Sequence, residues 1–203
     1  MSNRIDVEPT WTATGSLTGD YFDRVYAGSA DPWDFERSPY EAAKYAATVA
    51  VLPRPQYNRG LELGCSIGVL TRQLVPRCDR LVAVDVSEAA LTQARARCAD
   101  LAGVLFERCD IASEFPPGPF DLIVMSEVGY YFSRPDLERL RSRMSDSLTA
   151  RGHLLLVHYT GETNYPLAAD AVHEFFLESD DGTWTRLAEA RGAYRLDLLE
   201  KPA

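Results

Sequence analysis

Short runs of apolar residues alternate with amphipathic stretches along most of this chain. Each apolar run is about six residues long and ends at a polar or glycine-rich turn, which is typical of a strand buried on both faces. Between the runs, apolar residues recur three and four positions apart, which indicates a helix with one buried face. The pattern predicts strands at 59–64, 80–86, 104–109, 120–126 and 153–158, and helices that begin near residues 39, 69, 88 and 133 or lie around residues 171–176.

Strands that alternate with helices in this way belong to the α/β class, in which the sheet is mostly parallel. Two further strands, expected at 183–190 and 194–200, follow each other through a turn at Arg191-Gly192 and so form an antiparallel hairpin. The sequence therefore predicts a seven-stranded, mostly parallel sheet with an antiparallel last strand and with helices on both faces.

The chain reads as one domain with three parts. Residues 1–20 show little periodicity and are expected to form a mobile or loosely docked tail, 21–52 an N-terminal lid and helix, and 53–203 the core. The helix in the second part has a clear start, because Ser38 is a good cap and Pro39 and Glu41 follow it. The aromatic residues before this helix fit either a lid over a ligand or a hydrophobic clamp on the core.

A glycine-rich turn follows the first predicted strand. It has the spacing Glu62-x-Gly64-x-Ser66-x-Gly68, and Asp85 ends the next strand 23 residues after Glu62. A glycine turn followed by an acid about 20 residues later is typical of nucleotide sites, where the acid binds ribose hydroxyls. A carboxylate beside the turn would repel a pyrophosphate. It would attract the ammonium and sulfonium groups of S-adenosylmethionine (SAM).

This turn resembles motif I of the Rossmann-like SAM-dependent methyltransferases, whose usual form is [Asp/Glu]-x-Gly-x-Gly-x-Gly, with Ser66 as the departure. Beyond this motif, the chain resembles the nodulation protein S (NodS) family of small SAM-dependent N-methyltransferases. Members of that family methylate the free amino group of a de-N-acetylated chitooligosaccharide. The resemblance covers roughly residues 20–160 and rests also on Asp31-Pro32-Trp33, Pro39-Tyr40-Glu41, Phe120-Asp121-Leu122-Ile123-Val124, Glu127-Val128 and Tyr130-Tyr131.

The resemblance implies SAM as cofactor and assigns roles to individual residues. Glu62 and Gly64 would hold its amino-acid end, Asp85 its ribose, and Asp110 with Ile111 its adenine. The predicted cofactor site also includes Cys65, Ser66, Gly68, Val86, Ser126, Trp33 and Tyr40.

Methyl transfer to an amine requires that the amine lose a proton before or after the transfer. Glu127 and His158, at the ends of the fourth and fifth strands, are the candidate proton acceptors, and Tyr131 or its neighbour Tyr130 is expected to orient the amine. His158 fits equally well a structural histidine with hydrogen bonds. Trp33 and Tyr40 fit either stacking on a sugar or packing in the core.

Composition narrows the class of partner. The 203 residues carry a net charge of −9 and no basic run, which argues against nucleic acid and membrane surfaces as partners. The four cysteines form no Cys-x-x-Cys pair, so the sequence predicts neither a metal site nor disulfides. Without an apolar leader at the N-terminus, we expect a cytoplasmic protein that acts, as a monomer or homodimer, on a small-molecule or oligosaccharide acceptor.

Three alternatives remain open at this point. The same SAM site would serve an N- or O-methyltransferase of another small metabolite. A SAM-binding protein without catalysis is a second alternative, which convergence of Glu127, Tyr131 and His158 on one site would disfavour. The third is an NAD-dependent oxidoreductase, which Glu62 and the glycine spacing disfavour.

Overall fold

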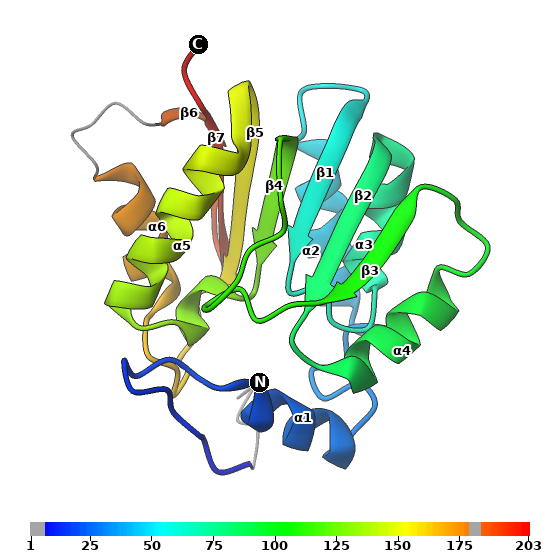
Figure 1. Ribbon diagram of the computed structural model, residues 1–203, viewed down its shortest axis with the longest axis vertical. Helices are drawn as coiled ribbons and strands as arrows, with labels where there is room; N and C mark the ends of the chain where they lie inside the picture. Colours follow the sequence, from blue (N-terminus) through cyan, green and yellow to red (C-terminus); the bar gives the residue numbers. More distant parts are fainter. Residues whose placement is uncertain (1–6, 179–183) are drawn as a thin grey trace.

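The computed structural model of the chain describes residues 7–178 and 184–203, and its centre is a seven-stranded sheet (Figure 1). The strands are Tyr57–Leu63 (β1), Cys78–Asp85 (β2), Val104–Arg108 (β3), Phe120–Ser126 (β4), Leu148–Tyr159 (β5), Thr185–Arg191 (β6) and Tyr194–Glu200 (β7). The α-helices are Gly19–Gly28 (α1), Pro39–Ala50 (α2), Val69–Leu74 (α3), Glu88–Arg97 (α4), Arg134–Ser147 (α5) and Ala169–Leu177 (α6), with single 3₁₀ turns at Val75–Arg77 (η1) and Gly129–Tyr131 (η2).

The strand order is β3-β2-β1-β4-β5-β7-β6. The first five strands in this order are parallel, β7 is antiparallel to β5, and β6 is antiparallel to β7. The predicted class is thus confirmed: an α/β sheet in which only the last strand of the chain runs against the others.

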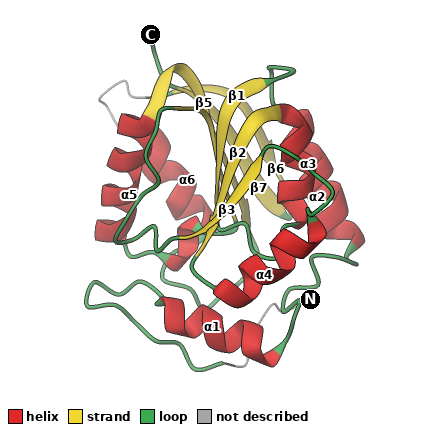
Figure 2. Ribbon diagram, turned by 45° about the vertical axis from the view of Figure 1, so that its right-hand side comes forward, coloured by secondary structure: helices red, strands yellow, loops and turns green. Residues whose placement is uncertain are grey.

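Alternate residues along the central strands face two separate cores. Ile123 and Met125 of β4 pack in the core under α5 and α6, whereas Leu122 and Val124 pack in the core under α2 and α3. Figure 2 shows the sheet between these two layers of helices, with α1 below its lower end. Burial on both faces explains why these strands read as continuous apolar runs.

The start of β5 differs from the prediction. We expected a turn at Arg151-Gly152 and a strand from His153, but β5 begins at Leu148, which pairs with Phe120 of β4. The Arg151 N–H donates to the Lys201 carbonyl, and Arg151 has a left-handed backbone (φ 60°). The sequence feature that we interpreted as a turn is therefore an irregularity inside a longer strand. The first hairpin strand begins at Thr185, and the predicted start at Thr183 lies outside the described residues.

The segment before α1 is more firmly attached than a loosely docked tail. Ser16 is fully buried, and its hydroxyl bonds the Asp136 carboxylate and accepts the Ser133 N–H at the start of α5. The Leu17 N–H donates to the Tyr131 carbonyl. The prediction was wrong for these residues because a serine in an irregular stretch gives no sequence signal of burial.

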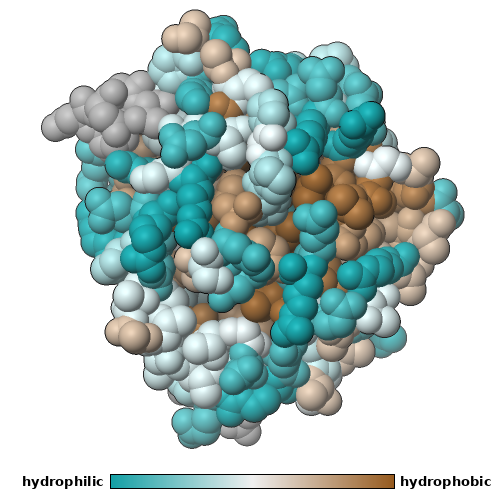
Figure 3. Space-filling view, in the orientation of Figure 1, coloured by the Kyte–Doolittle hydropathy of each residue, from teal (hydrophilic) through white to brown (hydrophobic). Residues whose placement is uncertain are grey.

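The surface of the molecule is mixed. Figure 3, in the orientation of Figure 1, shows apolar surface on the side where the edge strand β3 runs, and Leu105 of β3 is 53% exposed. In the described part of the chain, no helix combines the length and the apolar character needed to cross a membrane.

Candidate active site

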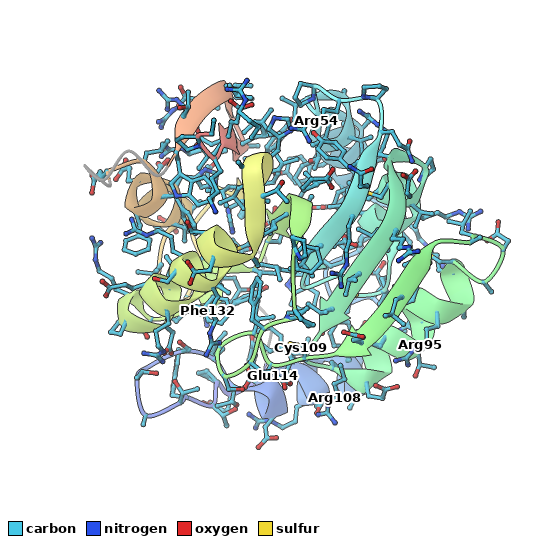
Figure 4. All side chains as sticks on the ribbon, turned by 45° about the horizontal axis from the view of Figure 1, so that its top comes forward. Arg54, Arg95, Arg108, Cys109, Glu114 and Phe132 are labelled. Atoms are coloured by element: carbon cyan, nitrogen blue, oxygen red, sulfur yellow. The ribbon has the colours of Figure 1, made fainter. Side chains whose placement is uncertain are left out.

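A cavity of about 950 Å³, counted out to its open mouth, lies at the carboxyl ends of the strands. This is where open α/β sheets bind their ligands. Figure 1 shows α1 lying across this end of the sheet, and Figure 4 shows Cys109 and Phe132 at the same end, with Arg54 at the opposite end. The cavity is lined by twelve of the site residues that the sequence predicted: Glu62, Gly64, Cys65, Ser66, Asp85, Val86, Asp110, Ile111, Ser126, Glu127, Tyr131 and Trp33.

The turn after β1 lets the backbone approach its neighbours closely. Gly64 is left-handed (φ 72°), and a Cβ there would lie 2.2 Å from Cγ2 of Val128. Ser66 is also left-handed (φ 51°), and its N–H donates to Asp85 at 2.8 Å. Gly68 does not line the cavity. A Cβ on Gly68 would lie 2.9 Å from Cα of Ala94, so this glycine permits close packing of α3 and α4.

Glu62 is a buried carboxyl group without enough partners. The residue is 2% exposed, and its Oε2 atom has no hydrogen-bond partner among residues 7–178 and 184–203. Burial raises the pKa of Glu62 to about 8. A buried polar atom without a partner is costly, and a ligand that supplies a cation and hydrogen-bond donors would satisfy it. Glu62 therefore fits the α-ammonium group of SAM.

Asp85 ends β2 beside this turn. Its Oδ2 accepts the Ser66 N–H at 2.8 Å and its Oδ1 accepts the Ser87 N–H at 2.9 Å. Burial raises the pKa of Asp85 to about 6, against the effect of these backbone hydrogen bonds. These backbone N–H groups hold the carboxylate in one orientation at the wall of the cavity. Val86 beside it and Ile111 after β3 line the adjoining wall.

Glu127 occupies the other end of the cavity, directly after β4. Its Oε1 is 2.5 Å from Nζ of Lys44, and its Oε2 accepts the Tyr159 N–H at 3.0 Å and the Tyr130 hydroxyl. Lys44 is 1% exposed and also pairs with Glu41 at 2.8 Å. Burial lowers the pKa of Lys44, but the two carboxylates outweigh it and raise the pKa above its usual value. Lys44 thus remains a cation at neutral pH.

The structure separates two predicted residues from the cavity. His158 is fully buried and does not line the cavity: its Nε2 accepts the Gly129 N–H at 2.9 Å, and its Nδ1 lies 2.9 Å from Nε2 of His173. With both ring nitrogens engaged, it cannot take a proton from an acceptor in the cavity. The Tyr40 hydroxyl donates to the Ala193 carbonyl, and from α2 it is Tyr45 that lines the cavity.

Aromatic residues from the segment before α2 close one side of the cavity. The Tyr26 hydroxyl lies 2.5 Å from the Ser66 hydroxyl, and its ring meets Trp33 edge-on at 5.7 Å. Trp33 stacks on Phe35 at 5.5 Å. The sequence placed these aromatics in a lid or a clamp and assigned only Trp33 among them to the site. The lining residues that the sequence analysis did not assign to the site are Leu17, Gly19, Phe22, Tyr26, Phe35, Tyr45, Ile67, Val69, Leu70, Val84, Cys109, Val128 and Phe132.

Comparisons with known proteins agree with this geometry. A sequence model of the family described as Nodulation protein S (NodS) matches residues 21–152. Nodulation protein S of Bradyrhizobium diazoefficiens is 36% identical over 102 residues, which cover 50% of this chain and 49% of the relative. The chain therefore spans about half the length of this curated relative.

Solved structures share the fold. One is the N-methyltransferase NodS of Bradyrhizobium japonicum in complex with S-adenosyl-L-homocysteine (SAH), with a TM-score of 0.76, 24% identity and coverage of 86% of this chain and 94% of that one. Another is a putative methyltransferase from Pseudomonas syringae, with a TM-score of 0.68, 38% identity and coverage of 80% and 99%. The turn after β1 and the order of the strands agree with these matches, and the chain belongs to the nodulation protein S (NodS) family.

Proposed function

We propose that this protein transfers the methyl group of SAM to the free amino group of an amino sugar or oligosaccharide. The observation that carries the proposal is the pair of carboxylates in one cavity. Glu62, whose Oε2 atom has no partner in the described part of the chain, lies at the glycine turn, and Glu127, fixed by three donors, lies at the end of β4. The first suits a ligand with an ammonium group, and the second suits an acceptor that becomes a cation.

SAM supplies a methyl group on a positively charged sulfur. In the proposed site, Glu62 and the backbone around Gly64 bind its amino-acid end, and Asp85 binds the ribose. Val86, Asp110 and Ile111 line the part of the cavity proposed for the adenine. The aromatic residues Tyr26 and Trp33 exclude water from the cavity, and water exclusion strengthens the electrostatic interactions inside it.

Glu127 acts on the acceptor. Its carboxylate is held in one orientation by Lys44, Tyr130 and the Tyr159 N–H, which pre-organises it toward the amine. As the nitrogen attacks, positive charge builds on it, and a fixed carboxylate nearby stabilises that charge. Glu127 is also the proposed acceptor of the amine proton, a contribution worth about 10²–10⁴-fold in rate.

The surroundings of the acceptor end favour a polar, extended acceptor. A second depression is lined by residues 159–168, which include Thr160, Glu162, Thr163 and Asn164. Its Tyr165 stacks on Tyr130 at 5.0 Å and meets Tyr131 edge-on at 4.6 Å, so the depression and the cavity share an aromatic wall. Aromatic faces beside hydroxyl and amide groups match the alternating apolar and polar faces of a sugar.

The first test is calorimetric titration with SAH of the wild type and of Asp85→Ala. We expect binding by the wild type and a loss of about 2 kcal/mol in the variant, since two ribose hydrogen bonds to a charged group disappear. An acceptor screen follows, with partly deacetylated chitooligosaccharides against their fully N-acetylated counterparts, whose amide nitrogens are not nucleophilic. Turnover of the acetylated compounds, or of neither set despite SAH binding, would count against an amino-sugar acceptor.

A further inference from the structure

A chain of three fully buried polar side chains runs from the turn after β4 to β7. His158 Nε2 accepts the Gly129 N–H at 2.9 Å, His158 Nδ1 is 2.9 Å from His173 Nε2, and His173 Nδ1 is 2.6 Å from Asp197 Oδ2. All three side chains are 0% exposed. The binding of cofactor and acceptor, as proposed above, uses none of them, yet together they cross the core under the site.

Donor and acceptor roles along this series of hydrogen bonds are fixed at the Gly129 end. A backbone N–H can only donate, so His158 Nε2 carries no proton and its Nδ1 does. That Nδ1–H donates to His173 Nε2, which leaves the proton of His173 on Nδ1, where it donates to Asp197. Each neutral imidazole therefore has one permitted tautomer, and every polar atom on both rings is used.

The far end of the chain is anchored by charge. Arg195, which is 1% exposed, donates from Nε to Asp197 at 2.9 Å and from Nη1 to Asp170 at 2.7 Å. Burial opposes ionisation of Asp197, but the hydrogen bonds from His173 and Arg195 outweigh it and hold the pKa below its usual value. An ionised Asp197 keeps His173 oriented, as a carboxylate does for a histidine in many catalytic sites.

The near end of the chain reaches the turn that carries Glu127. Glu127 lies two residues before Gly129 and has a left-handed backbone (φ 58°), a conformation that costs energy for a residue with a side chain. Gly129 approaches its neighbours so closely that a Cβ would lie 2.6 Å from Val172 and 2.8 Å from His158 Nε2. The turn packs closely against β5 and α6 at this point. The hydrogen bond from the Gly129 N–H to His158 fixes the orientation of the Gly129 peptide group.

We propose that His158, His173 and Asp197 are positioning residues for methyl transfer, which hold the Gly129 peptide and thereby place the Glu127 carboxylate at the acceptor end of the cavity. The inference rests on the proposed function of Glu127. None of the three touches the cavity, so each acts through the turn.

The protein offers a matched control for a substitution of His158 on the same strand. His153 of β5 is 2% exposed and hydrogen-bonds through Nδ1 to the Tyr57 hydroxyl at 2.7 Å, in the middle of the strand and five residues before His158. His158→Leu and His153→Leu both remove one buried imidazole and its hydrogen bonds from β5. They differ in whether the lost bond holds the Glu127 turn.

The experiment measures kcat and KM for methyl transfer and the Kd for SAH in the wild type, His158→Leu, His158→Gln and His153→Leu. We expect His158→Leu to lose about 10- to 100-fold in kcat, the scale of a misplaced catalytic group, with Kd for SAH within about threefold. His158→Gln can accept the Gly129 N–H and is expected to recover most of kcat. His153→Leu should keep wild-type kcat despite a comparable fall in Tm.

Equal kcat in the two leucine variants overturns the positioning role. If His158→Leu does not fold, long-range ¹H–¹⁵N NMR spectra of the wild type test the hydrogen bonds that join Gly129, His158, His173 and Asp197. The proposal requires the Nδ1–H tautomer at both His158 and His173, and an Nε2–H tautomer at His158 overturns it. Absence of methyl transfer to any amine by the wild type would instead refute the proposed function, so the two failures are distinguishable.

Discussion

The carboxyl group of Glu62 makes cofactor binding depend on pH in a calculable way. Burial raises the pKa of Glu62 to about 8, so below that pH the free protein holds this carboxyl largely protonated. An α-ammonium group binds the ionised form. SAH binding below pH 8 must therefore release a proton from Glu62, and affinity should rise with pH until about pH 8.

The magnitude follows from the ionised fraction, which with a pKa of about 8 is about 0.5 at pH 8 and about 0.01 at pH 6. The Kd for SAH should thus be about 50-fold higher at pH 6 than at pH 8, equivalent to about 2 kcal/mol. Asp85, whose pKa is raised by burial to about 6, adds a further factor of about two at pH 6.

This pH dependence of SAH binding can be measured by titration calorimetry. Titrations at pH 6, 7 and 8 yield Kd, and titrations at pH 7 in two buffers of different ionisation enthalpy yield the protons released, expected to be about 0.9 from Glu62. In Glu62→Gln this proton release should disappear, the binding should weaken, and only the twofold dependence from Asp85 should remain.

The same substitution should stabilise the free protein at alkaline pH. Glu62 keeps its proton in the folded state up to about pH 8 but loses it near its ordinary pKa of 4.5 when unfolded, so its contribution to stability falls as pH rises between these values. Glu62→Gln removes this loss and should raise the unfolding free energy at pH 8 by on the order of 4 kcal/mol. A Kd for SAH that stays constant from pH 6 to pH 8 would refute the reasoning.

Three further predictions concern the rest of the site. Glu127→Gln should lower kcat about 100-fold with Kd for SAH within about threefold, and wild-type turnover would remove Glu127 from the mechanism. Lys44→Met should lower the unfolding free energy, measured by denaturation, by about 3 kcal/mol, because it leaves two buried carboxylates without their cation; adding Glu41→Gln should restore part of this loss. Tyr26→Phe and Ser66→Gly should each weaken SAH binding about fivefold, and the double variant should be no weaker, since both remove the same hydrogen bond; additive losses would contradict this.

The strands and the glycine turn were predictable because their signals are local. An apolar run between turn residues defines a buried strand, and the spacing from Glu62 to Asp85 defines the turn and the acid beyond it. The start of β5 was not predictable, because Leu148 pairs with Phe120, a residue far away in the sequence. The firm attachment of Ser16 depends on Asp136 in the same way.

His158 shows where a signal existed and was not used. Leu154 and Leu156 face the core under α5 and α6, and the period of two along a strand puts His158 on that same face. Its position at the end of an apolar run suggested catalysis, but strand parity indicated burial against α6. Lys44 gave a weaker signal: with Glu41 and Tyr45 it lies on the buried face of α2, and only the tertiary structure shows Glu127 opposite it.

The place of β7 in the sheet has a consequence for synthesis of the protein. It is the last strand of the chain, yet it lies between β5 and β6, and six of its seven residues are buried. During translation, β5 therefore keeps an open edge until β7 has also left the ribosome, and an exposed edge strand is a template for aggregation. Completion of the sheet, and with it protection of the edge of β5, waits for residues Tyr194–Glu200.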